Sequence, residues 1–501
     1  MNAQSTLFTG GSLDVACGPD GRILAVGPGA AAAAGRSARR VALRGEVLPG
    51  LHDAHLHLSG LAETELIVDL TTAHSLGEAT GRIARALPRL PETGWLVGRG
   101  WYSQGWREQP DRRALDQVVG ARPAILTQRD GHSAWVSSAA LRQAGIDRRT
   151  PDPPGGRIDR DAAGHATGLL REHAVDLVRR RVPEPAAEVR DRGLQRALRR
   201  LAATGLTSVS CMDQAPILRS LQRLQEAGRL PIRVTYNLPV ADLDEAVRVG
   251  LRSGFGDDRL RIWGVKAFLD GALGSGTALM SGGAGVRQYE TAALREIAAT
   301  CATAQLNVAW HAIGDLAVHQ ALDALEPLAG AWSLWRPRIE HAQFVQVADR
   351  GRMARLGVVA SMQPSHAVTD RALVQREWAQ AAPLGYAWKA LLDAGVVVAF
   401  GSDAPVEPAD PLYGIDAATG WRRRVGWLPE LALTRSAAVR ASTWGAAYAV
   451  GLERRLGRLR PGQLCDLTVV DGGRAVATVV GGEVVWQRPE RERGPERGPS
   501  V

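Results

Sequence analysis

The architecture of this chain can be read from one segment, Leu48-Pro49-Gly50-Leu51-His52-Asp53-Ala54-His55-Leu56-His57. In a β-strand, residues i and i+2 point to the same face, so an extended segment would place His55 and His57 side by side. Two imidazoles in this arrangement can bind one metal ion. The apolar residues before them, broken by Pro49 and Gly50, predict that the pair lies at the end of a buried strand.

Seven further apolar segments have the character of strands, and most are separated by stretches long enough for a helix. With the first, the expected strands are residues 46–57, 206–211, 232–237, 260–268, 306–311, 338–341, 358–362 and 396–401. Eight units of a strand followed by a helix are typical of a (β/α)8 barrel. We therefore predict an α/β fold of this TIM-barrel type.

The rest of the chain divides around that barrel. Residues 1–48 and 452–487 contain short strand-like runs with glycine turns, and we expect them to form one small β-sandwich built from both termini. The barrel is expected over residues 49–451. A structureless loop between the first two strands would be implausibly long, so we expect an inserted subdomain over residues 60–204. The Arg-, Glu-, Pro- and Gly-rich residues 488–501 are expected to be disordered.

Composition narrows the classes of partner. No apolar run reaches the ~18 residues of a membrane span, and the first residues lack the basic and apolar regions of a signal peptide. The four cysteines are widely scattered, which favours a reducing compartment, and we expect a cytoplasmic protein. The net charge is +9, but the arginines are dispersed among acidic residues, so we expect no nucleic-acid partner.

Candidate metal ligands fall at the ends of the predicted strands, in the order that a barrel site requires. Catalytic groups of such barrels lie at the carboxyl ends of the strands. The candidate ligands are His55, His57, Lys266, His311, His341 and Asp403. Imidazole nitrogens with a carboxylate oxygen suit zinc or a similar divalent ion.

Lys266 is unusual because it lies inside an apolar segment of a chain that has only one other lysine, Lys389. Burial favours the neutral amine, which can add carbon dioxide to give an anionic carbamate that binds metal. The alternative is a lysine that reaches the barrel rim or pairs with Asp270. Asp403 also has two interpretations, as a ligand that accepts a proton from water, or as the N-cap of a helix.

Other residues have weaker support. His132 is a candidate substrate contact in a polar turn, and Trp101 with Trp106 and Trp135 could form an aromatic wall, although a tryptophan more often lies in the core. Asp315 or Glu340 could orient a metal-bound histidine, and surface exposure is the alternative for both. Five other histidines, His74, His165, His173, His319 and His366, have no supporting pattern and are left unassigned.

With these residues assembled, the chain resembles the amidohydrolase superfamily, in its family 3 or YtcJ-like branch, which includes N-substituted formamide deformylases. The matching segments are residues 49–57, 131–136, 265–271, 311–315, 338–341, 361–365, 401–403, 457–462 and 466–467. The resemblance implies a centre of one or two metal ions. It also implies that His55, His57, His311, His341 and Asp403 are metal ligands, that Lys266 is the carbamate bridge, and that Asp403 is the general base. Gln363, in one of the matching segments, is a further candidate substrate contact.

The expected function is therefore metal-dependent hydrolysis of a C–N bond in an amide or an N-substituted formamide. We expect the substrate to be a small molecule. The sequence leaves open whether the protein forms a homodimer. Another reaction on the same scaffold is the main alternative, namely deamination, lactone or carbamate hydrolysis, or isomerisation, because a fold does not fix the chemistry. A non-catalytic binding barrel is a remote alternative, since all six ligands are present.

Overall fold

The computed structural model describes residues 4–90, 94–103, 106–128, 133–183, 186–274, 276–283 and 285–489. The chain forms two compact units. One contains Met1–Gly60 and Ala197–Val501, and the other contains Leu61–Arg196. The tail that we expect to be disordered lies, from residue 490 onward, outside the described residues.

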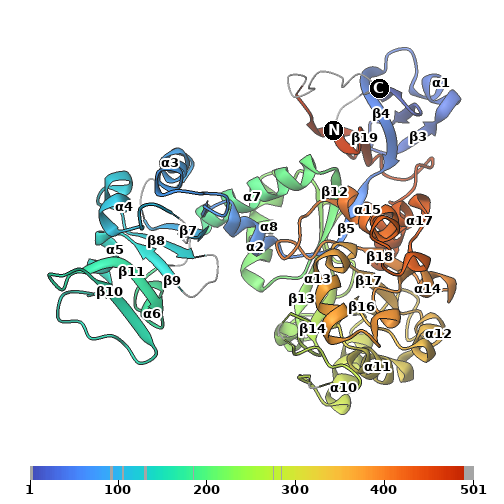
Figure 1. Ribbon diagram of the computed structural model, residues 1–501. Coiled ribbons are helices and arrows are strands. Elements are labelled where there is room, and N and C mark those ends of the chain that lie inside the picture. Colours follow the sequence, from blue (N-terminus) through green and yellow to red (C-terminus); the bar gives the residue numbers. More distant parts are fainter. Residues whose placement is uncertain are drawn as a thin grey trace. The chain divides into compact units, whose positions relative to one another are not determined.

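The first unit is built around a sheet of eight parallel strands (Figure 1). In sheet order the strands are β5 (Leu51–Leu56), β12 (Leu206–Cys211), β13 (Arg233–Pro239), β14 (Leu260–Phe268), β15 (Asn307–Ala312), β16 (Arg338–His341), β17 (Val359–Met362) and β18 (Val398–Phe400). Each corresponds to a predicted strand. Backbone hydrogen bonds from Asp403 N to His55 O (2.7 Å) and from His57 N to Ala404 O (2.8 Å) close the sheet into a barrel. The predicted fold class is confirmed.

The barrel closes where the segment after β18 lies beside β5, and the two backbones approach each other closely there. A side chain at Gly401 would place its Cβ 2.5 Å from the backbone nitrogen of His55, so the close approach requires glycine. The buried carboxylate of Asp53 accepts hydrogen bonds from the backbone nitrogen (2.9 Å) and hydroxyl (2.5 Å) of Ser402. These contacts fix the segment that carries Asp403 beside the segment that carries the two histidines.

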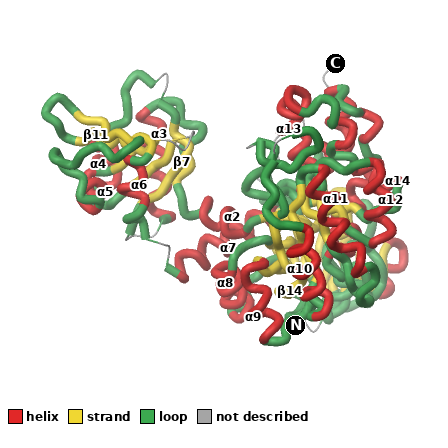
Figure 2. Tube along the Cα trace, turned by 90° about the horizontal axis from the view of Figure 1, so that it is seen from below, coloured by secondary structure: helices red, strands yellow, loops and turns green. Residues whose placement is uncertain are grey.

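Helices surround the barrel strands, as Figure 2 shows. Those that follow the strands are α8 (Ala215–Glu226), α9 (Leu243–Arg248), α10 (Thr291–Thr303), α11 (Asp315–Leu325), α12 (Val347–Leu356), α13 (Pro364–Glu377) and α14 (Trp388–Asp393), then α15 (Pro411–Asp416), α16 (Arg422–Val425), α17 (Arg435–Arg440) and α18 (Ala446–Ala449). Helices α2 (Leu58–Thr64) and α7 (Ala187–Ala203) lead into and out of the second unit.

Both ends of the chain contribute to a seven-stranded sheet. Its strands, in sheet order, are β21 (Glu483–Gln487), β20 (Arg474–Val480), β19 (Leu467–Asp471), β4 (Arg39–Pro49), β1 (Thr6–Gly11), β2 (Val15–Cys17) and β3 (Ile23–Val26), with α1 (Ala30–Ala34) beside them. Apolar residues from the N-terminal and C-terminal strands share one buried core, so the two halves pack as a sandwich. Strand β4 leads directly into β5, and a buried ion pair between Arg233 and Asp466 (2.7 Å) links barrel and sandwich.

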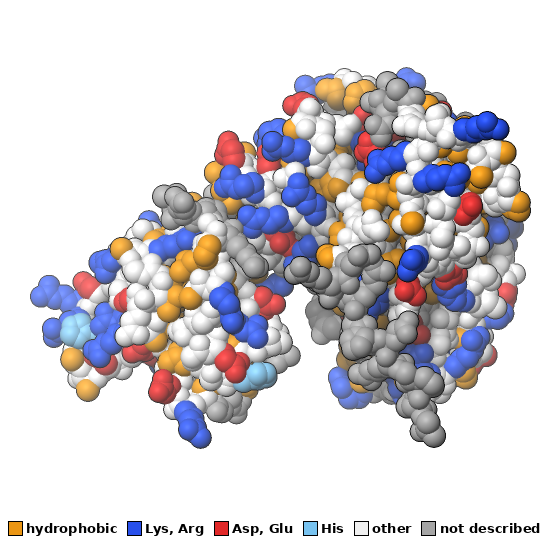
Figure 3. All heavy atoms as spheres, turned by 90° about the horizontal axis from the view of Figure 1, so that it is seen from above, with side chains coloured by type: hydrophobic (Ala, Val, Ile, Leu, Met, Phe, Trp, Pro, Cys, Tyr) orange, Lys and Arg blue, Asp and Glu red, His pale blue; other side chains and the backbone are white. Residues whose placement is uncertain are grey.

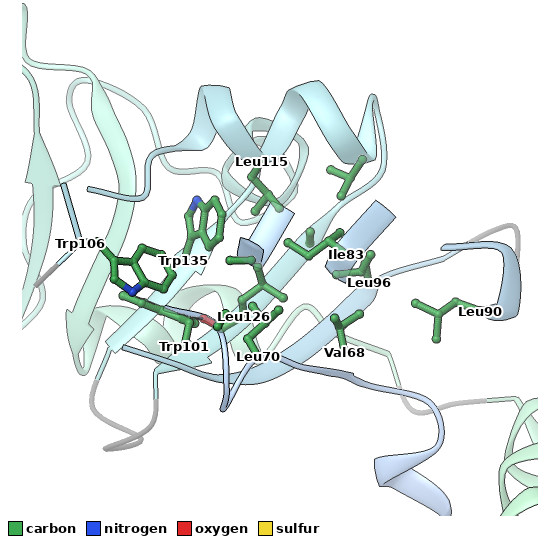
Figure 4. Close-up of a cluster of buried hydrophobic side chains, with 14 residues drawn as sticks. Val68, Leu70, Ile83, Leu90, Leu96, Trp101, Trp106, Leu115, Leu126 and Trp135 are labelled. Carbon is green, nitrogen blue, oxygen red and sulfur yellow. Dashed lines mark hydrogen bonds between the residues drawn. The ribbon is translucent and has the colours of Figure 1, made fainter. Parts of the chain in front are cut away.

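The second unit contains a six-stranded sheet with its own core. The strands, in sheet order, are β10 (Gly156–Arg160), β11 (Ala166–Glu172), β9 (Ser133–Val136), β8 (Ala124–Gln128), β7 (Leu96–Trp101) and β6 (Val68–Asp69). The helices are α3 (Leu76–Ala86), α4 (Arg112–Val119), α5 (Ser138–Gln143) and α6 (Ala174–Arg179). Figure 4 shows Trp101, Trp106 and Trp135 within the buried apolar cluster of this unit.

The surface agrees with the dispersed charge of the sequence. On the face drawn in Figure 3, Lys and Arg side chains are spread out and interspersed with Asp and Glu. Among the residues described, no helix is both long and apolar enough to cross a membrane.

Candidate metal centre

The His-x-His pair lies at the carboxyl end of β5, opposite Asp403. The Nε2 atoms of His55 and His57 are 3.4 Å and 3.2 Å from the same carboxylate oxygen, Oδ1 of Asp403. The candidate ligand atoms of these three residues all lie within 4.8 Å of one another. The spacing expected for an extended strand therefore brings both imidazoles to one carboxylate.

His341 and Asp403 reach the same region through a strained backbone. Their φ angles are 72° and 61°, in the left-handed region that non-glycine residues rarely adopt. Each such residue costs about 1–3 kcal/mol and persists only where surrounding contacts enforce it. For Asp403 one such contact is the hydrogen bond from its backbone nitrogen to His55 O. The strain turns both side chains into the barrel mouth.

Two buried histidines have their protonation fixed by an acceptor behind the ring. The Nδ1 of His55 lies 2.7 Å from Oε2 of Glu340, and the Nδ1 of His341 lies 2.9 Å from Oε1 of Gln363. A carboxylate or an amide oxygen only accepts, so each Nδ1 carries the proton. This leaves Nε2 of each ring with a lone pair, the form that binds metal.

His311 follows the same rule, since its Nε2 lies 3.0 Å from the backbone oxygen of Gly271 and the lone pair falls on Nδ1. His57 differs, because its Nδ1 lies 3.4 Å from Asp213 and its Nε2 lies 3.2 Å from Asp403. Burial opposes the charge on His57, but the hydrogen bonds with these two carboxylates outweigh it and raise the pKa to about 9, so a metal ion would displace a proton from this ring. The ring of His311 is 4.5 Å from that of His341, centre to centre, so the four imidazoles form one continuous cluster.

Lys266 lies at the edge of this cluster, deep in β14. Its side chain is buried, and among the described residues its Nζ has no hydrogen-bond partner. It is 4.7 Å from the centre of the Phe268 ring. The alternative interpretation required Lys266 to reach the barrel rim or to pair with Asp270. Its side chain is buried, so it does not reach the rim. Asp270 does not pair with it, because its carboxylate accepts backbone hydrogen bonds from residues 279, 313 and 314.

Burial dominates the electrostatics of the centre. It lowers the pKa of Lys266 to about 8, although Glu340 and Asp403 oppose the shift. Burial also lowers the pKa of His55 to about 4 and that of His311 to about 3, with Lys266 as the next contributor in both cases. These imidazoles are therefore neutral at pH 7, as metal ligands must be.

In the two carboxylates of the centre, neighbouring groups outweigh the effect of burial on the pKa. Burial disfavours the carboxylate of Asp403, but hydrogen bonds with His366 and His57 outweigh it and hold the pKa well below its usual value. Burial likewise opposes the charge on Glu340, and the neighbouring Arg338 outweighs it and lowers the pKa. Both side chains are ionised at neutral pH.

The donor set fits a divalent cation. Among the described residues, the buried Nε2 of His55 has no hydrogen-bond partner, and a metal ion would satisfy it. Neutral imidazole nitrogens together with a carboxylate oxygen are the ligands that zinc prefers. Asp403 is not a helix N-cap, since the next helix, α15, begins at Pro411 and is capped by Asp410.

The residues expected to contact substrate have different positions. Trp101 is 2% exposed, and its Nε1 donates to the backbone oxygen of Leu126 in the core of the second unit, so the aromatic-wall interpretation is wrong for this residue. Gln363 is buried behind His341 and orients that ring. His132 lies outside the described residues.

Of the two candidate orienting carboxylates, Glu340 contacts a histidine of the cluster and Asp315 does not. Asp315 accepts a hydrogen bond from the backbone nitrogen of Ser281 at 2.7 Å instead. Both are fully buried, so the alternative of surface exposure is wrong.

Two residues of the centre were missed by sequence reasoning. Asp213 follows β12 by two residues, so the strand-end rule could have found it. His366 lies in the first turn of α13, and its Nε2 is 3.2 Å from Oδ2 of Asp403. A lone histidine at a helix start has no spacing that would distinguish it from a structural one.

Comparison with known proteins is consistent with this centre. The model of the amidohydrolase family matches residues 41–485. The protein YtcJ of Bacillus subtilis is 30% identical, with 89% of this chain and 90% of that protein covered. The N-substituted formamide deformylase of Arthrobacter pascens is 29% identical, with 85% and 83% covered. The crystal structure of an uncharacterized metal-dependent hydrolase from Pyrococcus furiosus matches with a TM-score of 0.74 and 30% identity, over 91% and 95% of the chains.

Proposed function

Because this chain belongs to the amidohydrolase family and is a metal-dependent hydrolase, we propose that it cleaves a C–N bond in an amide or an N-substituted formamide. The substrate is a small molecule that enters the mouth of the barrel. The proposal assigns the metal to His55, His57, His311, His341 and Asp403, with zinc as the ion and a carbamate on Lys266 as a further ligand.

The observation that carries the proposal is the position of Asp403. One oxygen of its carboxylate faces His55 and His57, and the other faces His366. Hydrolysis of an amide needs a base that takes a proton from water and then gives it to the departing nitrogen, since an amine anion is a poor leaving group. Asp403 is ionised and lies beside the imidazoles that would hold the metal, so it can serve both steps.

A bound divalent cation would supply two kinds of chemistry, polarising the scissile carbonyl and lowering the pKa of a water molecule. The remaining work belongs to the protein. Glu340 and Gln363 hold two of the imidazoles in the tautomer that binds metal, and Asp213 accepts from the Nδ1 of His57. Asp403 holds the proton between its removal from water and its delivery to nitrogen.

The carbamate is supported by the environment of Lys266. Carbon dioxide reacts with a neutral amine, and burial lowers the pKa of this amine to about 8. His311 lies outside the two sets of residues whose ligand atoms are within 4.8 Å of one another. A carbamate would add a negatively charged carboxylate to the Lys266 side chain, which is a ligand group that the neutral amine lacks.

The apolar part of the substrate has a candidate contact in Phe268. Its side chain is 46% exposed at the carboxyl end of β14, and its ring centre is 5.1 Å from that of His311. An exposed aromatic ring beside the metal ligands suits an apolar group on the reacting amide. The similarity to an N-substituted formamide deformylase favours the same class of substrate.

The test is metal analysis of the purified protein combined with an activity screen. The panel contains N-formyl and N-acyl amines together with lactones, carbamates and aminopurines, and the products are identified by mass spectrometry. We expect one or two zinc ions per chain and release of a free amine from the first group. Turnover of lactones or aminopurines alone would replace the proposed reaction by another reaction of the family. A metal-free protein that binds these compounds without turnover would point to a non-catalytic barrel.

A further inference from the structure

His366 has no role in the proposed function, although it contacts the carboxylate to which that function assigns the transfer of the proton. It lies in the first turn of α13 with 13% of its side chain exposed, and its Nε2 is 3.2 Å from Oδ2 of Asp403. An ionised carboxylate only accepts hydrogen bonds, so the imidazole is the donor. The other oxygen, Oδ1, faces His55 and His57. The contact therefore distinguishes one oxygen that faces the candidate ligands from one that His366 holds.

A second hydrogen bond joins the same face of α13 to the segment that carries Asp403. Thr369 lies three residues after His366, so the two side chains are neighbours on the helix surface. The hydroxyl of Thr369 donates a hydrogen bond of 2.7 Å to Oε1 of Glu407, four residues after Asp403. Helix α13 is thus attached to this segment at two points, and of the two it is the His366 contact that reaches Asp403.

The hydrogen bond from His366 is the contact that a bound metal ion would leave in place. An ion held by His55 and His57 takes the Nε2 lone pairs of both rings, so neither nitrogen can donate a hydrogen bond to Oδ1. The bond from the backbone nitrogen of Asp403 to His55 O fixes the main chain but not the torsions of the side chain. Among the side chains that the structure describes, His366 is then the donor that fixes the direction of this carboxylate.

We propose that His366 is a positioning residue, which holds Oδ2 of Asp403 where it can take a proton from water and pass it to the departing nitrogen. The proposal rests on the proposed function, which makes Asp403 the base. A carboxylate oxygen has two lone pairs, so Oδ2 can accept from His366 and still take the proton. The base must lie within hydrogen-bond reach of that proton, and a displacement of about 1 Å can lower the rate about 100-fold.

The alternative is a structural role, in which His366 only attaches α13 to the barrel. His366→Ala removes the donor, whereas His366→Gln keeps it, because the amide nitrogen of glutamine reaches about as far as Nε2. Thr369→Val breaks the other contact of the same helix face and leaves the bond to Asp403 intact. His319→Gln is the matched control, since that histidine is half exposed on α11 and pairs with Asp349.

The kinetic test measures kcat and KM of the full-length protein on a compound of the activity screen that the wild type turns over. Elemental analysis gives the metal content, and thermal unfolding checks the fold. We expect kcat of His366→Ala to fall by about 100-fold with KM and metal content unchanged. His366→Gln should recover most of this loss, and Thr369→Val and His319→Gln should behave as the wild type. An unchanged kcat in His366→Ala, equal losses in His366→Ala and His366→Gln, or the same loss in Thr369→Val would overturn the positioning role.

A spectroscopic test of the same contact does not depend on turnover. Protein loaded with Co²⁺ in place of zinc has a visible absorption spectrum that reports the geometry of the ligands, including the oxygen of Asp403. We expect a changed spectrum in His366→Ala and the wild-type spectrum in His366→Gln and Thr369→Val. Identical spectra in the wild type and His366→Ala would overturn the role of His366.

The two tests also separate this role from the proposed function. A wild type that binds metal but cleaves no amide or formamide would overturn the proposed function, and the cobalt spectra would still decide whether His366 orients Asp403. A wild type that binds no Co²⁺ would overturn both.

Discussion

The carboxylate of Glu340 lies 2.7 Å from the Nδ1 of His55, and both side chains are fully buried. The other oxygen of Glu340 is 2.8 Å from the guanidinium of Arg338, which is also buried. The carboxylate thus connects an arginine at the centre of the barrel to a candidate metal ligand. A metal-bound histidine fixed in this way is a stronger base and a better-oriented ligand.

The first prediction concerns this contact. Glu340→Gln keeps the shape of the side chain but removes its charge, so His55 becomes a weaker ligand. We expect the affinity for zinc to fall by about 10–100-fold, measured by competition with a chelator. Glu377→Gln, on the exposed end of α13, should leave the affinity unchanged. Equal affinities in the two variants would mean that Glu340 has no influence on the metal.

The second prediction tests the carbamate on Lys266. Arginine keeps the positive charge and much of the length of lysine, but it stays protonated and cannot add carbon dioxide. Lys266→Arg should therefore lose bound metal and nearly all activity, by elemental analysis and a product assay. Lys266→Ala should show the same defect and regain part of it when a short carboxylic acid is added to replace the missing carbamate.

The control for this pair is Lys389→Arg, which changes the other lysine of the chain, an exposed residue paired with Asp393. It should behave as the wild type. If Lys266→Arg retains full metal content and activity, the carbamate is not part of the centre.

The third prediction concerns substrate preference. Phe268→Ala removes an exposed ring beside His311, so it should raise KM for an N-benzyl formamide by about 10-fold or more and change KM for N-methyl formamide little. Metal content should be unchanged, since the ring donates no ligand. Val249→Ala, a change at another exposed apolar residue of the same unit, is the control. A uniform change in KM for both substrates would remove Phe268 from the specificity pocket.

The strands of the barrel were readable from the sequence because they are short apolar runs with sharp ends. Residues 206–211 and 260–268 coincide with β12 and β14. The first predicted strand, 46–57, proved to be two, with β4 ending at Pro49 and β5 starting at Leu51. Alternation of side chains shows where the backbone is extended but not which sheet it joins, so a chain that passes from one sheet to the next looks continuous.

The site was predictable only as far as the strand ends identify it. His55, His57, His341 and Asp403 lie close together because the carboxyl ends of barrel strands meet in space. His366 was not predictable, since its contact with Asp403 depends on how α13 packs. The pairing of Glu340 with His55 joins residues 285 positions apart, and no local pattern encodes it.

The last prediction follows from the position of Trp101. Its indole packs against Trp135 with ring centres 6.4 Å apart and donates a 2.6 Å hydrogen bond to Leu126 O, inside the core of the second unit. Trp101→Ala leaves a cavity and an unpaired carbonyl, so we expect it to destabilise that unit by about 3–5 kcal/mol. Hydrogen–deuterium exchange of the backbone amides in β7 and β8 measures this loss of stability within the second unit. Global unfolding is less suitable, because a chain with two units does not unfold in a single two-state step.

Trp101→Phe is the matched variant, because it keeps an aromatic ring but removes the donor to Leu126. It should destabilise the same strands less, by about 1–3 kcal/mol. If Trp101 instead lined the substrate pocket, Trp101→Ala would raise KM for bulky substrates while exchange in β7 and β8 stayed as in the wild type. Faster exchange in these strands with an unchanged ratio of KM values for bulky and small substrates is the expected result, because a side chain enclosed by the core cannot contact the substrate.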